Sequence, residues 1–139
     1  MCFGSHNKYK AKKAVCSAGH VHDSTKEARR CDELHLLQRV GEIDELELQK
    51  EYLLIPPLYR EIELKERYKA GKNKGQPKIK RVCEEKKVVY KADFVYIDKK
   101  TGKIVIEDCK GMRTKEYILK RKLVKQLYCK GDGTVFVET

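Results

Sequence analysis

Two aspartates in neighbouring apolar segments could do chemistry together. The segments Tyr90–Asp98 and Lys103–Lys110 each have the composition of a β-strand, and the turn between them contains the pair Thr-Gly. If residues 99–102 form the loop, Asp93 and Asp108 lie directly opposite each other on one face. Directly opposed like charges destabilise a sheet, so some further interaction must offset the repulsion between Asp93 and Asp108. A bound divalent cation is the simplest one.

Lys110 follows Asp108 by two residues and therefore shares its face of the strand. Hard cations such as Mg²⁺ prefer oxygen ligands and commonly use only one or two protein carboxylates. A metal held by Asp93 and Asp108 would activate water and stabilise charge on a phosphate, and Lys110 would support this electrostatically. Glu107 points to the other face and is expected to be structural.

Two further polar residues have open roles. Ser24–Glu27 has the pattern of a capping box, in which Glu27 bonds back to the start of a helix. Capping and metal ligation are compatible, so Glu27 is also a candidate third ligand and catalytic helper. Gln49 closes a strand-like segment, where it is either a contact to substrate or water or simply a polar strand end.

The composition indicates one basic, globular domain over residues 1–139. The net charge is +11 and the pI about 9.3, which favours a polyanionic partner such as nucleic acid. The excess charge is concentrated in residues 58–87, which have eleven basic and five acidic groups, and in residues 111–139. No apolar run is long enough for a membrane span, and we expect a cytoplasmic protein.

A second candidate surface is the basic segment 115–128, whose periodicity predicts a helix with Ile118, Leu119, Leu123 and Leu127 facing inward. A helix start with a threonine and free N–H groups is a natural phosphate contact. The alternative is an ordinary solvated face. The residues expected to contact DNA are Arg113, Thr114, Tyr117, Lys120 and Lys122, with Tyr117 stacking on a base or sugar.

The six cysteines are widely spaced and include no C-x-x-C pair, which favours a reduced intracellular protein over a disulfide scaffold. Cys16, His20, His22 and Cys31 could together bind zinc. Their spacing is not one of the usual zinc patterns, so we favour a small hairpin that leads into a helix. A zinc-stabilised adaptor is a third functional hypothesis.

The order of elements predicts an α/β (α+β) sandwich whose strands are covered on both faces. A first helix begins at Ser24 and ends at Gly41. Strands are expected at 43–49 and 51–55, at 88–97 and 104–109, and at 134–137, with the second helix at 115–128. Residues 58–87 are expected to form a basic arm or insertion, built as a short helix or irregular segment and a flexible loop.

The chain resembles the PD-(D/E)XK nuclease superfamily, in particular its small phage-encoded members. Asp108, Cys109 and Lys110 match the (D/E)-x-K element, and Asp93 matches the preceding aspartate, although Ala92 stands where many members have proline. Glu27 is similar to the first-helix acid of that superfamily, and residues 114–120 are similar to its helix after the motif. The resemblance implies a restriction-endonuclease-like core of order α-β-β-β-α-β. It also implies a homodimer in the host-cell cytoplasm that acts on branched DNA such as a Holliday junction.

The sequence therefore predicts a DNA endonuclease dependent on Mg²⁺ or Mn²⁺, with Glu27, Asp93, Asp108 and Lys110 as its catalytic residues. Few of the expected DNA contacts could read base edges, which favours recognition of structure over sequence. The alternative is a non-catalytic nucleic-acid-binding protein with a nuclease-like fold.

Overall fold

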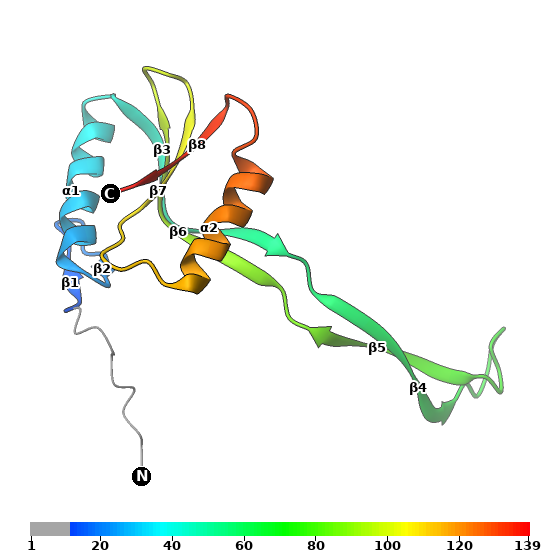
Figure 1. Ribbon diagram of the computed structural model, residues 1–139. Coiled ribbons are helices and arrows are strands. Elements are labelled where there is room, and N and C mark those ends of the chain that lie inside the picture. Colours follow the sequence, from blue (N-terminus) through cyan, green and yellow to red (C-terminus); the bar gives the residue numbers. More distant parts are fainter. Residues whose placement is uncertain (1–11) are drawn as a thin grey trace, which may run out of the picture.

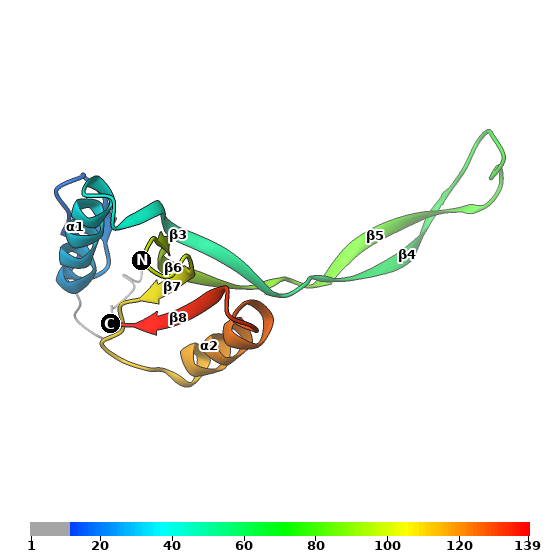
Figure 2. The same cartoon turned by 90° about the horizontal axis from the view of Figure 1, so that it is seen from above.

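A four-stranded mixed sheet lies between two helices in the computed structural model, which describes residues 12–139 (Figure 1). The strand order is β3 (Ile43–Ile55), β6 (Val88–Asp98), β7 (Ile104–Asp108) and β8 (Thr134–Glu138). Helix α1 (Thr25–Arg39) covers one face and α2 (Lys115–Tyr128) the other (Figure 2). The mixed α+β class expected from the sequence is confirmed.

The connections explain the mixed pairing. Strand β6 runs antiparallel to both β3 and β7, whereas α2 crosses over and returns the chain so that β8 lies parallel to β7. Apart from two added hairpins, the order along the chain is a helix, three strands, a helix and a strand. The additions are a hairpin of β1 (Ala14–Val15) and β2 (Val21–His22), and one of β4 (Leu58–Arg67) and β5 (Pro77–Glu85).

Both helices begin where their capping signals predict. The Ser24 hydroxyl accepts the Glu27 N–H, and the Thr114 hydroxyl accepts the Tyr117 N–H. Gly41 has φ of 81° beyond the end of α1, as expected of a glycine that closes a helix. The expected inner face of α2 is wrong at two positions, because Leu119 and Leu127 are exposed while Tyr117 and Val124 are buried.

The two faces of the sheet have separate cores. The α1 face buries Ala28, Cys31 and Leu34 against Phe94 and Tyr96. The α2 face buries Tyr117 and Val124 of the helix against the sheet residues Tyr90, Ala92, Val95 and Ile106. Phe94, Tyr96 and Val105 thus face α1 whereas Val95 and Ile106 face α2, so the predicted covering of these strands on both faces is confirmed.

The segments 43–49 and 51–55 form one continuous strand, β3, rather than two. The separation was predicted because polar residues interrupt the apolar pattern there. In the structure the interruption is an irregularity: Gln49 has φ of 56° although it lies inside a strand. Along β3, Leu48 packs on the α1 face whereas Tyr52 packs on the α2 face, so the side-chain alternation shifts near Gln49.

Residues 58–87 form a long two-stranded arm that projects from the sheet on the side opposite α1 (Figures 1 and 2). An arm was predicted, but its secondary structure was predicted wrongly, because the strands β4 and β5 replace the expected short helix or irregular segment and flexible loop. Alternating Glu-Ile-Glu-Leu residues in β4 fit a strand better than a helix. The arm starts after Pro56 and Pro57, which cannot donate to a sheet ladder.

Within residues 12–139, each helix is too short and too polar to cross a bilayer.

Candidate metal centre

The central hairpin has the predicted register. Phe94 pairs with Glu107 and Ile97 with Ile104, so the next positions along the same register are Asp93 and Asp108. Both helices begin at the end of the sheet where β7 finishes (Figure 1). The two aspartates therefore lie near the N-termini of both helices, where the positive ends of the helix dipoles stabilise negative charge.

Asp108 is fully buried, and neither of its carboxylate oxygens makes a hydrogen bond within residues 12–139. Its backbone carbonyl accepts the Thr139 N–H at 3.0 Å, which fixes its position beside β8. Two more buried oxygens, the hydroxyls of Tyr90 and Tyr117, also lack hydrogen-bond partners among the described residues, and Asp108 contributes to the raised pKa of both tyrosines. A buried carboxylate without hydrogen bonds costs about 1–3 kcal/mol or more, and Lys110 offsets part of that cost as an ion pair, so a further ligand for Asp108 would be favourable.

Asp93 is held in place by hydrogen bonds. One of its oxygens accepts the Cys109 N–H at 2.8 Å, and the other accepts the Gln49 side-chain amide at 3.4 Å. Burial, and then the neighbouring Asp108 carboxyl group, raise the pKa of Asp93 to about 8. The raised pKa favours the protonated form of Asp93 at neutral pH, and a divalent cation bound here would replace that proton.

Gln49 is directed at Asp93 by unusual backbone geometry. A positive φ inside a strand is costly for a residue other than glycine, by roughly 1–2 kcal/mol. The same conformation brings the Gln49 amide to the Asp93 carboxylate. Strain of this kind gathers at functional sites, so the structure favours the functional interpretation of Gln49 over that of a polar strand end.

Glu27 both caps α1 and faces the aspartates. Its carboxylate oxygens accept the Ser24 hydroxyl and the Asp23 N–H, each at 3.3 Å, so Glu27 bonds back to the helix start as predicted, although to the residue before the cap rather than to the Ser24 N–H. Its charge contributes to the raised pKa of Asp93, so it lies within electrostatic reach of the pair. Each carboxylate oxygen has a second lone pair, and the cap leaves Glu27 able to bind a cation.

Lys110 is the cation nearest to this acidic cluster. Its Nζ lies 3.3 Å from an Asp108 oxygen, an ion pair that lacks the angles of a hydrogen bond. Burial opposes the charged form, but Asp108 and Asp93 prevail and raise the pKa of Lys110. Lys110 is thus an ammonium at neutral pH, which supports an electrostatic role over that of a general base.

A pocket of about 330 Å³ adjoins the cluster. Its wall combines the first residues of β6, where the arm returns to the sheet, with the start of α2. The lining residues are Tyr90, Lys91, Lys110, Met112, Thr114, Glu116, Tyr117 and Lys120. Three lysines and a helix start around one opening form a suitable place for a phosphate.

Four of the five predicted DNA contacts are accessible and one, Tyr117, is buried. Thr114, Lys120 and Lys122 are accessible around the start and outer face of α2, although Lys120 also pairs with Glu116. Arg113 is exposed and pairs with Glu138. Tyr117 was expected to stack on a base or sugar. It is only 8% exposed and its hydroxyl is buried, so its ring is not available for stacking.

Glu107 lies on the opposite face, as predicted for a structural residue. Its carboxylate is fully buried and accepts two N–H groups of Arg30, at 2.6 and 3.0 Å. The hydroxyls of Tyr96 and Thr139 complete its shell. This network fastens α1 to β7 and so fixes Glu27 relative to Asp108.

Asp93 and Asp108 supply the oxygen ligands that a small divalent cation prefers, and the unpartnered Asp108 oxygens are the observation that favours an ion over a purely structural cluster. Glu27 lies within electrostatic reach of Asp93, but among residues 12–139 it does not complete a close group of three ligands with the two aspartates. Sequence reasoning overlooked two participants, Tyr90 and Arg30. Neither follows a spacing rule, because Tyr90 comes near Asp108 only in the folded sheet and Arg30 reaches Glu107 through the packing of α1 on the sheet.

Comparisons with known proteins place the chain without assigning an activity. No curated protein and no solved structure gives a significant match. A family model described as a protein of unknown function (DUF1064) matches residues 6–138. Because that match spans nearly the whole sequence, the chain belongs to the DUF1064 family.

Proposed function

We propose that this protein is a DNA endonuclease dependent on Mg²⁺ or Mn²⁺, which hydrolyses phosphodiester bonds. The observation that supports it most is the buried Asp108 carboxylate without hydrogen bonds, beside Asp93 and Lys110 at the converging helix starts. A buried carboxylate that makes no hydrogen bond is typical of a site that binds a ligand. The resemblance of these residues to the PD-(D/E)XK pattern agrees with the proposal.

In this proposal Asp93 and Asp108 hold the ion, with Glu27 as a third ligand. The bound ion would supply a polarised water and charge stabilisation at the scissile phosphate. Lys110 remains protonated and offsets charge that accumulates on the phosphate oxygens. Gln49 fixes the orientation of the Asp93 carboxylate through its amide.

DNA is the proposed substrate because positive charge surrounds the pocket and extends along the arm. The turn at the tip of the arm, residues 68–76, contains Lys69, Lys72 and Lys74 and no acidic residue. We call these the arm-tip lysines. They lie far from the sheet in both views (Figures 1 and 2), so they would contact phosphates well away from the cleaved bond.

The arm has no core of its own, which also favours a large partner. Isolated two-stranded hairpins are marginally stable in water. Apolar residues of the arm such as Leu58 and Ile79 are more than half exposed. A long, basic, exposed arm next to the pocket suits a branched duplex, such as a four-way junction, better than a short linear site.

A homodimer is also part of the proposal, since two active sites are needed to cut two strands. The outer face of α2 offers a candidate contact, with Leu119 at 60% and Leu127 at 53% exposure, eight residues or a little over two helical turns apart. Analytical ultracentrifugation of the wild type and of Leu119→Asp tests this part separately from catalysis.

The decisive experiment is a cleavage panel of linear, nicked, flap and four-way DNA with Mg²⁺, Mn²⁺ or Ca²⁺. We expect cutting with Mg²⁺ and Mn²⁺, and binding without cutting with Ca²⁺. Asp108→Asn should abolish cutting, and the matched control Asp132→Asn, an exposed aspartate, should cut normally. Cutting that survives in Asp108→Asn would disprove the site. A wild type that binds with steep salt dependence but never cuts would favour the non-catalytic alternative.

A further inference from the structure

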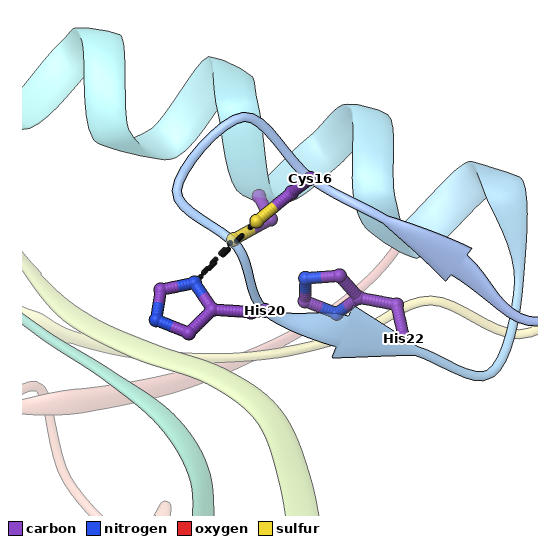
Figure 3. A group of neighbouring side chains, drawn as sticks. Cys16, His20 and His22 are labelled. Carbon is purple, nitrogen blue, oxygen red and sulfur yellow. Dashed lines mark hydrogen bonds between the residues drawn. The ribbon is translucent and has the colours of Figure 1, made fainter.

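A second cluster of potential metal ligands lies away from the carboxylates, between the β1–β2 hairpin and α1. It consists of Cys16, His20, His22 and Cys31, and one ligand atom from each lies within 4.8 Å of all the others. Figure 3 shows Cys16 and the two histidines directed toward one another from the hairpin. Cys31 comes from α1 and is completely buried.

The distances agree with a tetrahedral zinc centre. Zn–S bonds of about 2.3 Å and Zn–N bonds of about 2.0 Å imply S···N edges of about 3.5 Å. The Nδ1 atom of His20 lies 3.4 Å from the Cys16 sulfur and 3.8 Å from the Cys31 sulfur. Two of the six distances thus match the edges of a ligand shell, the others are at most 4.8 Å, and both cysteines are free thiols.

The local chain is built to present these ligands. The Cys16 N–H donates to the His20 carbonyl at 3.0 Å, and Gly19, with φ of 85°, closes the turn by donating to the Cys16 carbonyl. This turn places Cys16 and His20 together. His22 follows two residues later and is therefore on the same side of β2 as His20.

Ordinary packing does not account for the cluster. His22 is 4% exposed, and its Nε2 atom has no hydrogen-bond partner among residues 12–139. Strands β1 and β2 have only two residues each, which is too little to hold a hairpin by itself. One further tie to α1 is the hydrogen bond from the Ser17 N–H to Asp32.

We propose that Cys16, His20, His22 and Cys31 bind one structural zinc ion that fastens the β1–β2 hairpin to α1. Two thiolates and two imidazoles are the soft ligand set that selects zinc over magnesium. Four protein ligands complete the tetrahedron, so the site is structural and has no position for substrate. The ring of His35 stacks on His20 at 5.5 Å and keeps its orientation.

This proposal stands apart from the nuclease proposal. Its spacing, with three, one and eight residues between successive ligands, differs from common zinc patterns, which is why sequence reasoning preferred a plain hairpin. Because α1 also supplies Glu27 and Arg30, the zinc would support the position of both.

The test uses the full-length protein, purified under reducing conditions without chelator and analysed for metal by mass spectrometry. We expect one zinc per chain, and after exchange with Co²⁺ the visible absorption of tetrahedral cobalt with thiolate ligands. Cys31→Ser and Cys16→Ser should lose the metal, whereas the matched controls Cys83→Ser and Cys129→Ser should keep it. Asp108→Asn should also keep it, which separates this site from the carboxylates.

A second measurement covers variants that fail to fold. Removal of zinc from the wild type by a chelator should lower its melting temperature, and added Zn²⁺ should restore it. Absence of zinc from the wild type, even after reconstitution, would overturn the proposal. Equal loss of metal in Cys83→Ser and Cys31→Ser would overturn it as well.

Discussion

Replacing Asp108 by asparagine should make the metal-free protein more stable, although it removes a buried ion pair with Lys110. Asp108 is fully buried without a hydrogen bond, and its carboxylate lies beside Asp93 and Glu27. One lysine within the cluster does not balance three carboxylates. An uncharged amide of nearly the same shape removes one of the repelling charges.

The magnitude follows from the pKa of Asp93, which burial and Asp108 raise to about 8. A raised carboxyl pKa means that the native state binds the proton more tightly than the unfolded state does. Stability is therefore greatest below the unfolded pKa of about 3.9 and falls as pH rises toward 8. At pH 7 the loss is at most about 4 kcal/mol, and Asp108 accounts for only part of it. We expect Asp108→Asn to gain about 1–3 kcal/mol at pH 8, and less at pH 5.

Urea denaturation at both pH values, in buffer without Mg²⁺ or Mn²⁺, measures this gain, with Asp132→Asn as the control. Mg²⁺ at about a hundred times its dissociation constant should then stabilise the wild type by about 2.7 kcal/mol and leave Asp108→Asn unchanged. A variant that is less stable than the wild type at both pH values would refute the reasoning, because Asp108 would then be a structural partner of Lys110.

The remaining predictions address other parts of the molecule. Lys110→Ala should reduce the cleavage rate by about 10²–10³ while DNA binding in Ca²⁺ is preserved, and Lys100→Ala, on an exposed turn, should cut normally. Replacing all of the arm-tip lysines by glutamine should weaken binding and lower the salt dependence of log K by about 2–3; an unchanged slope would exclude the arm from the interface. Gln49→Gly should match or exceed wild-type stability in thermal unfolding, since glycine tolerates its φ, but should cut more slowly. Glu107→Gln should cost about 3–5 kcal/mol in urea unfolding because it removes the buried anionic partner of Arg30, whereas Glu33→Gln, at the exposed end of the same arginine, should cost less than about 1 kcal/mol.

Local signals made much of the fold predictable. The caps at Ser24 and Thr114 defined the helix starts, and the Thr101–Gly102 turn set a register that brings Asp93 and Asp108 together. Segments without a local rule were predicted less well. Leu119 and Leu127 have helical spacing but face solvent, because the sheet contacts only the stripe that contains Tyr117 and Val124.

Long-range contacts explain what sequence reasoning missed at the site. The pairing of Arg30 with Glu107 joins residues 77 positions apart, and no spacing pattern indicates it. The positive φ of Gln49 likewise depends on the whole sheet, since glutamine has no preference for that conformation. Zinc binding by Cys16, His20, His22 and Cys31 was considered but set aside on spacing, because only the packing of β1 and β2 on α1 brings the four side chains close together.

The way the arm joins the sheet makes the arm structurally independent of the strands that carry Asp93 and Asp108. Ile55, the last residue of β3, pairs with Val88, the first of β6, so the two ends of the arm are neighbouring strands about 4.8 Å apart. A short turn could close the same gap, and the sheet would keep its register and its aspartates. Insertions, deletions or a new tip sequence can therefore change the arm, and with it the proposed DNA contacts, without moving the proposed metal ligands Asp93 and Asp108.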